Sequence, residues 1–144
     1  MAEAKFIISR KKVLEQYNKI KNLGLKVSYS LKTNPDVGKI LADETDCWFS
    51  VHIENELEHI KEKDFSRILF LAQGWNFEEL DALFQKNIHR FVVDNTQDLD
   101  TLLKYLENIQ NKNIQNKNIL NENIQKYPIT LFLRMKLKEM TIHT

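Results

Sequence analysis

Lys32 is the residue whose type and position best suit covalent chemistry. It follows the alternating run 26–31, in which Ser28 and Ser30 share a face with Lys32. Small serines leave room beside a lysine at the end of a strand. A lysine that loses hydration there has a lowered pKa, and its neutral amine can form a Schiff base with an aldehyde. The alternative interpretation is an ordinary solvated lysine that ends a strand.

Polar side chains also close the other apolar runs of the chain. In parallel α/β folds the carboxyl ends of the strands share one edge, and ligand sites collect there. The alternative is that strands must end and that loops are polar. Besides Lys32, Thr33 and Asn34, the residues at such ends are His52, Glu54, Asn55, Gln73, Gly74, Asp94, Asn95 and Arg134.

The apolar pattern that must position these residues alternates between strand and helix. Strand-type runs cover residues 26–31, 47–51, 67–72, 90–93 and 128–135, and Phe6, Ile7 and Ile8 form a shorter β-like run. Helical spacing is expected over 11–22, from Pro35 to near Asp43, around Leu57 and Ile60, from Phe77 to Phe84, and from Leu99 to Leu106. This alternation with short links predicts a parallel sheet. The pattern alone leaves open a doubly wound sheet and a (β/α)8 barrel.

Residues 108–126 break this rhythm. Isoleucine recurs every five residues in N-I-Q-N-K-N-I-Q-N-K-N-I-L-N-E-N-I-Q-K. A step of five rotates successive residues by about 140° on a helix and alternates faces on a strand, so neither element gathers these isoleucines into one stripe. We interpret the segment as a low-complexity, Asn-rich insertion within a domain that spans 1–144.

The charge balance and composition of the sequence limit which partners and which location we expect. The 144 residues include 21 Lys and Arg against 20 Asp and Glu, a formal net charge of +1. Without a cationic excess to neutralise phosphates, we expect neither nucleic acid nor membrane as a partner. Cys47 is the sole cysteine, which excludes an intrachain disulfide and favours a cytoplasmic location. No apolar run reaches the roughly 18 residues of a membrane span.

The cysteine and the histidines give no further chemistry. Cys47 adjoins an apolar run and is expected to be a buried small hydrophobe rather than a nucleophile. His59, His89 and His143 lack the spacing of metal ligands, so we expect no metal site.

The segment 29–35, Y-S-L-K-T-N-P, resembles the Y-A-V-K-A-N-P segment of the fold-type III pyridoxal-phosphate enzymes. These are the ornithine, diaminopimelate and arginine decarboxylases, which are related to alanine racemase. Other segments match the family in the same order and nearly span the chain outside the insertion. They are F-I-I-S at 6–9, D-C-W-F-S-V-H-I-E-N-E-L-E at 46–58, R-I-L-F-L-A at 67–72, I-H-R-F-V-V-D-N at 88–95 and L-R-M at 133–135.

The resemblance implies a role for several residues. Lys32 matches the lysine that holds pyridoxal 5'-phosphate as the internal aldimine, which makes it the candidate catalytic residue. Glu56 matches an acidic position near the cofactor, and Arg134 matches an arginine that lies against the pyridoxal ring. Ser50 and His52 fall at further cofactor-facing positions. The implied activity is decarboxylation of an amino acid of the ornithine or diaminopimelate type.

Two of these positions depart from the family pattern. Ser50 stands where the decarboxylases usually have Asp, and His52 stands where a small residue is usual. The lost carboxylate changes the charge of the site. The departures suggest a divergent branch, such as one that acts on carboxylated polyamines, or a non-catalytic homologue that binds or regulates a partner.

The resemblance also implies parts that the 144 residues do not supply. The family's glycine-rich phosphate loops, the acid facing the pyridine nitrogen and a second β-domain come later in the chain, whereas this sequence has three glycines in total. A (β/α)8 barrel needs about 250 residues. We therefore expect the first five parallel strands of a barrel of the alanine racemase type, inactive alone. Its partner would be a second copy in a full-length homodimer or a complementing C-terminal half.

Overall fold

The computed structural model describes residues 6–71, 73–117 and 128–134. Five parallel strands form one sheet in the order β1-β2-β3-β4-β5. Their bounds are Ser28–Ser30 for β1, Trp48–Val51 for β2, Ile68–Leu71 for β3, Arg90–Val93 for β4 and Thr130–Leu133 for β5. The prediction of an α/β fold with five parallel strands is confirmed.

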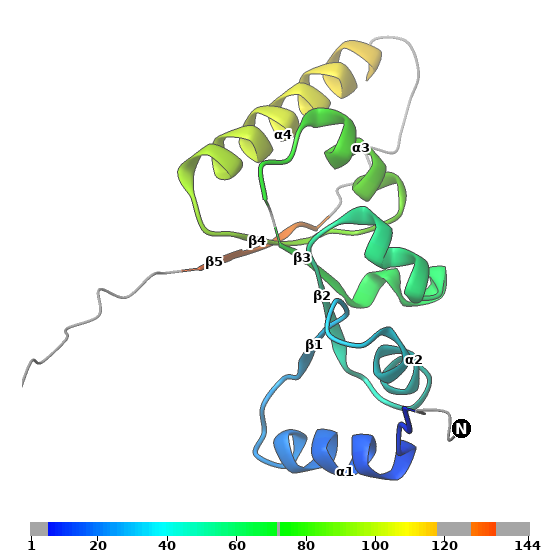
Figure 1. The fold of residues 1–144 in the computed structure, drawn as a ribbon. Coiled ribbons are helices and arrows are strands. Elements are labelled where there is room, and N and C mark those ends of the chain that lie inside the picture. Colours follow the sequence, from blue (N-terminus) through cyan, green and yellow to red (C-terminus); the bar gives the residue numbers. More distant parts are fainter. Residues whose placement is uncertain (1–5, 72, 118–127, 135–144) are drawn as a thin grey trace, which may run out of the picture.

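Helices connect successive strands. In Figure 1 they follow one another around one side of the sheet, from α1 at the bottom to α4 at the top. Their bounds are Arg10–Lys21 for α1, Pro35–Glu44 for α2, Glu54–His59 for the 3-10 helix η1, Glu62–Arg67 for the 3-10 helix η2, Phe77–Gln85 for α3 and Thr96–Lys117 for α4.

The sequential strand order distinguishes between the two topologies that the pattern left open. A doubly wound sheet reverses its direction of growth at a switch point, and its ligands bind there. Within the described strands each connection adds the next strand on the same side, with no reversal. The architecture is therefore compatible with part of a (β/α)8 barrel.

The two faces of the sheet differ in burial. Phe49, Phe70 and Phe91 lie on the face under the helices and are at most 1% exposed. We call this the helix-covered face, and its burial is the main source of apolar stabilisation. We call the other face the open face; it carries Ser28, Ser30, Trp48, Ser50, Leu69, Leu71, Arg90, Val92, Thr130 and Phe132. None of these side chains is fully buried.

The connection after β2 differs from the expected α-helix around Leu57 and Ile60. Two 3-10 helices replace it, and Ile60 between them has an extended backbone with φ −121° and ψ 139°. The buried apolar residues Leu57, Ile60 and Phe65 are three and then five positions apart. That spacing gives no continuous α-helical stripe, so short 3-10 turns bury these residues instead.

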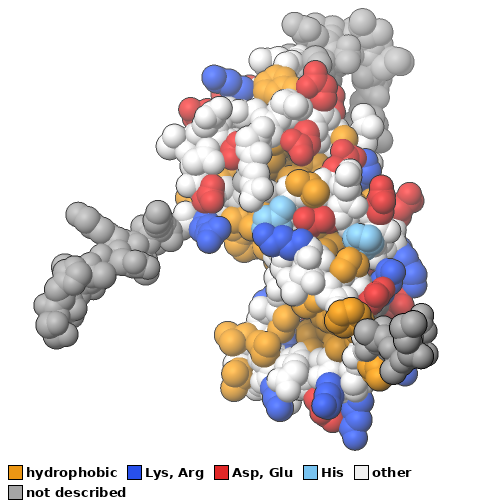
Figure 2. Space-filling model, viewed as in Figure 1, with side chains coloured by type: hydrophobic (Ala, Val, Ile, Leu, Met, Phe, Trp, Pro, Cys, Tyr) orange, Lys and Arg blue, Asp and Glu red, His pale blue; other side chains and the backbone are white. Residues whose placement is uncertain are grey.

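The chain before α1 also differs from expectation. Phe6, Ile7 and Ile8 form no strand, and the first two are at least 90% exposed. Figure 2 shows hydrophobic side chains gathered at the lower end of the molecule, where α1 lies. An apolar run is not sufficient for a strand here, because no neighbouring strand among the described residues pairs with it.

Helix α4 enters the Asn-rich segment. It continues through Lys117, so the first part of the predicted insertion extends a helix, and Ile109 packs partly against the core. The rest of the predicted insertion, up to residue 126, lies outside the described residues. None of the described helices is long and apolar enough to cross a membrane.

The predicted burial of Cys47 is confirmed, at 1% exposure. Its thiol donates to the backbone oxygen of Trp48 over 3.1 Å. Burial raises the pKa of this thiol to about 11, which suppresses the thiolate that nucleophilic chemistry would need.

Candidate functional site

Lys32 and His52 occupy equivalent places at the ends of neighbouring strands. The register pairs Ser30 with Ser50, and Lys32 and His52 each lie two residues further on. The backbone N–H of Leu31 donates to the Ser50 carbonyl over 3.2 Å, which extends the ladder beyond the last paired residues. Two of the predicted site residues are thereby brought to one corner of the sheet.

A tight turn fixes the backbone around Lys32. The N–H of Thr33 donates to the Ser30 carbonyl over 3.1 Å, and Asn34 then caps α2 by accepting from Asp36 and Val37 at 3.0 and 3.3 Å. Pro35 at the first helical position favours this start. The asparagine of the K-T-N-P motif is thus a helix cap.

The packing of α2 on β1 also locates the turn. A Cβ added to Gly38 would lie 2.6 Å from Leu31 Cδ2, so glycine lets α2 lie this close to the Leu31 side chain. The Tyr29 hydroxyl donates to the Asn34 carbonyl over 3.2 Å. Burial raises the pKa of Tyr29, so its hydroxyl stays protonated and keeps donating.

The Lys32 side chain itself is exposed. It forms no hydrogen bond or ion pair with any residue that the structure describes. The loss of hydration expected from the sequence therefore does not occur in this arrangement. The amine is accessible to a ligand at the carboxyl edge.

His52 and Glu56 form a second, more buried pair. Glu56 Oε2 accepts from the backbone N–H of His52 over 3.2 Å and lies 4.0 Å from His52 Nδ1. Their side chains are 15% and 12% exposed. His52 Nδ1 is itself buried and has no hydrogen-bond partner in the structure. A proton on that nitrogen would face the Glu56 carboxylate.

Serine hydroxyls line the open face next to this pair. Ser50 Oγ and Ser28 Oγ are 2.7 Å apart and share a hydrogen bond. Ser30 Oγ is buried and has no hydrogen-bond partner in the structure. Buried polar atoms normally find a partner, so Ser30 Oγ and His52 Nδ1 are two buried polar atoms whose hydrogen bonding is unsatisfied in the described residues.

Arg134 lies at the far end of the same edge. Its backbone N–H donates to the Val93 carbonyl over 2.9 Å, and its guanidinium lies 3.9 Å from Asp94 Oδ2. The Arg134 side chain is 68% exposed. No described contact joins it to Lys32, His52 or Glu56, so the predicted site residues form separate groups along one edge.

Asp98 organises the loops between β3 and α4, a role that our reading of the sequence missed. Its carboxylate is 2% exposed and accepts from Gly74 N–H at 3.0 Å and from Asn95 Nδ2 at 2.7 Å. Asn95 in turn accepts from the Asp98 N–H over 2.8 Å. The asparagine followed three residues later by an acid is a capping signal that the sequence contains.

The described residues suit one end of pyridoxal phosphate better than the other. The Lys32 amine provides a group for the aldehyde, whereas Arg134 follows β5 at the opposite end of the strand order and does not share a site with Lys32 in this arrangement. A phosphate needs a cradle of free backbone N–H groups. The Gly74 N–H already donates to Asp98, and Gly38 lies inside a helix. The Gly24 N–H likewise donates to the Lys21 carbonyl, so none of the three glycines offers a free N–H to a phosphate.

Within the described chain, no three His, Cys, Asp or Glu side chains gather as a metal site would require. Comparison with known proteins found no matching family model, no matching curated protein and no matching solved structure.

Proposed function

We propose that this chain is part of a pyridoxal-phosphate-dependent amino-acid decarboxylase barrel of the alanine racemase type, with Lys32 as the lysine that takes the cofactor. The observation that carries the proposal is the turn after β1. It presents an accessible amine at the end of β1, next in the sheet to the strand end that carries His52, within a motif that resembles the family's. The strand order and the unpaired polar atoms on the open face add support.

In this proposal each group has a separate task. When bound, pyridoxal phosphate supplies an electron-withdrawing ring that stabilises the carbanion left by loss of carbon dioxide. Lys32 positions the aldehyde end at the carboxyl edge. His52 holds a proton at Nδ1, and Glu56 orients His52 through its backbone N–H. The role of Arg134 as a cation for the ring oxygen rests on the resemblance alone, because it lies at the opposite end of the described sheet from Lys32.

A second candidate function follows from Ser50. Ser50 stands where the family usually has a carboxylate, and its hydroxyl forms a hydrogen bond with the Ser28 hydroxyl. Without that charge, the open face could bind a partner in a non-catalytic homologue instead of reacting with a substrate. A divergent enzyme for carboxylated polyamines would also tolerate the change, because its substrate differs in charge.

An absorbance titration with pyridoxal phosphate tests the main proposal. We expect weak but saturable binding by this chain, because the phosphate end lacks donors. Lys32→Ala removes the saturable component, whereas Lys39→Ala on α2 leaves it, since Lys39 is an exposed lysine paired with Asp36. Equal loss in both variants contradicts the assignment of Lys32. A saturable component that survives Lys32→Ala contradicts it as well.

A further inference from the structure

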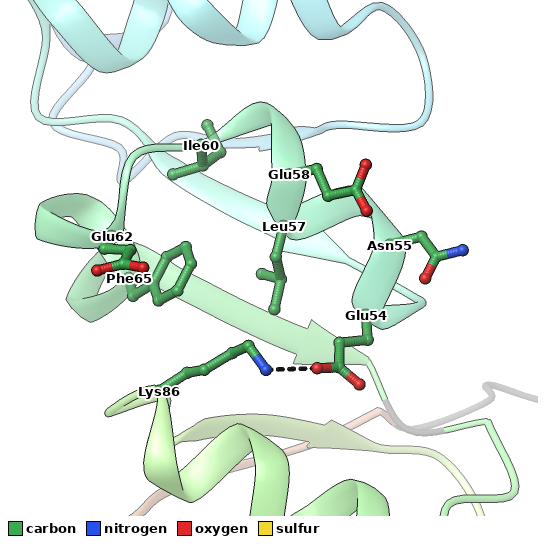
Figure 3. Close-up of a pocket in the computed structure, with 8 residues that line it drawn as sticks. All are labelled: Glu54, Asn55, Leu57, Glu58, Ile60, Glu62, Phe65 and Lys86. Carbon is green, nitrogen blue, oxygen red and sulfur yellow. Dashed lines mark hydrogen bonds and ion pairs between the residues drawn. The ribbon is translucent and has the colours of Figure 1, made fainter.

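A cavity of about 320 Å³ lies between the two 3-10 helices and the end of α3 (Figure 3). This volume is at the lower limit of small-molecule pockets, so it suits a small ligand rather than a protein segment. None of the residues assigned above to the cofactor site lines it. Its lining residues are Glu54, Asn55, Leu57, Glu58, Ile60, Glu62, Phe65 and Lys86.

The floor of the cavity is apolar. Leu57, Ile60 and Phe65 are 4%, 6% and 8% exposed and come from the segment that connects β2 to β3. Figure 3 shows Phe65 and Leu57 near each other, with the Lys86 stem running below them. An aliphatic chain placed here would lose contact with water, at a gain of roughly 0.8 kcal/mol for each buried methylene.

One alkylammonium group already occupies part of this cavity. The Lys86 ammonium pairs with Glu54 Oε1, as the dashed line in Figure 3 shows, and its methylene stem helps to line the space. These two residues are 32 positions apart in sequence. Lys86 therefore provides an internal example of the chemistry that the cavity accepts, an aliphatic stem with a cationic head.

The remaining charge of the lining is negative. Glu58 and Glu62 form no ion pair or hydrogen bond with any part of the chain that the structure describes. The lining therefore carries three carboxylates and one ammonium group, that of Lys86, around its apolar residues. An anion would be repelled by this rim, and a neutral chain would leave the carboxylates without a partner.

We propose that this cavity binds a small aliphatic primary amine as its ammonium form, with Glu54 as the main anionic contact. The amine competes with Lys86 for the Glu54 carboxylate while its chain covers Leu57 and Phe65. Glu58 and Glu62 raise the local concentration of cations. The site is independent of Lys32 and of the cofactor assignment.

NMR titration of the folded chain tests this proposal with three probes of equal length: n-butylammonium, 1-butanol and butyrate. We expect saturable shifts of the Leu57 methyl signals with butylammonium, weaker shifts with butanol and none with butyrate. Shifts of equal size with butanol overturn the role of charge. An absence of saturable shifts with butylammonium overturns the site.

Substitutions at the ion pair make the test sharper. Both side chains are about 40% exposed, at 41% for Glu54 and 38% for Lys86, so replacing them spares the core. Glu54→Gln weakens butylammonium binding by about fivefold, and Lys86→Ala strengthens it by roughly two- to threefold because the competing ammonium is gone. Glu78→Gln on α3 is the control, because Glu78 is exposed and does not line the cavity. Weaker binding in Lys86→Ala, or no effect of Glu54→Gln, contradicts the proposal.

Discussion

The helix-covered face and the open face are formed by alternate residues of the same strands, but they differ in burial and in polarity. Phe49 at the helix-covered face is fully buried, whereas its chain neighbour Ser50 at the open face is only half-buried and bonds to another serine. One face gains free energy from apolar burial. The other keeps polar atoms such as Ser30 Oγ without partners.

The difference separates stability from chemistry within one sheet. Substitutions on the helix-covered face are expected to lower the free energy of unfolding. Substitutions on the open face and at its carboxyl edge are expected to change binding and leave folding almost intact. The first of the four variants below compares the two faces directly, and the other three test contacts around them, from the largest expected effect to the smallest.

Phe70→Ala is expected to have the largest effect. Phe70 is 1% exposed, and its ring stacks on Trp75 with centroids 6.5 Å apart. Its loss leaves a cavity and lowers the free energy of unfolding by about 3–5 kcal/mol in urea titration. Ser50→Ala, on the open face of the neighbouring strand β2, is the control and costs less than about 1 kcal/mol. Similar losses in the two variants would remove the distinction between the faces.

Asp98→Ala comes next, because it removes a buried acceptor. The Gly74 N–H and the Asn95 amide lose their partner, and the free energy of unfolding falls by about 2–3 kcal/mol. Asp100→Ala, at an exposed position of the same helix, controls for the loss of one charge. Thermal or urea unfolding measures both. A loss in Asp100→Ala as large as that in Asp98→Ala would show that the buried network is not the cause.

Gly38→Ala is expected to affect both the stability of the fold and the carboxyl edge of the sheet. The added methyl group would lie 2.6 Å from Leu31 Cδ2, so either the buried Leu31 side chain or α2 must shift, at a cost of about 1–3 kcal/mol. The same shift disturbs the turn that carries Lys32. We expect lower unfolding free energy together with weaker pyridoxal-phosphate binding, whereas Lys39→Ala changes neither. Undiminished stability in Gly38→Ala would show that α2 adjusts without strain.

The smallest effect concerns pH and the exposed Asp46. Hydrogen bonds from Lys21 and Tyr17 lower the pKa of this carboxyl from 3.8 to about 2. Because the folded pKa is the lower one, the pair stabilises the fold above about pH 4, and this contribution is lost as pH falls towards 2. Asp46→Asn should therefore be less stable than the parent chain at neutral pH, with the gap closing in that acid range. Urea titrations across the range measure it, and a gap that stays constant with pH argues against the ion pair.

The strands and most helices could be predicted because their signals are local. Arg90 to Val93 contains the short apolar run F-V-V, and Asn34-Pro35 is a strong helix start. The segment around Leu57 was mispredicted because its apolar spacing is ambiguous and tertiary burial favours short 3-10 turns. The exposed run at Phe6 shows the same limit, since a strand needs a partner strand to form.

The carboxyl-edge site was predicted only in outline. Parallel topology places Lys32, His52 and Arg134 on one edge, and this much follows from their positions after apolar runs. The exposure of Lys32 depends on a turn whose geometry the sequence does not specify. The Glu54–Lys86 pair joins residues 32 positions apart, and no periodicity of either segment indicates it.

The most direct test of the central claim is a map of which lysines react with pyridoxal phosphate. The folded chain is treated briefly with the cofactor, reduced with borohydride and digested, and the pyridoxyl label on each lysine is measured by mass spectrometry. The account predicts that Lys32 is labelled several-fold more than Lys39, although both are exposed. Equal labelling of the two lysines would contradict a cofactor site at the carboxyl edge of β1.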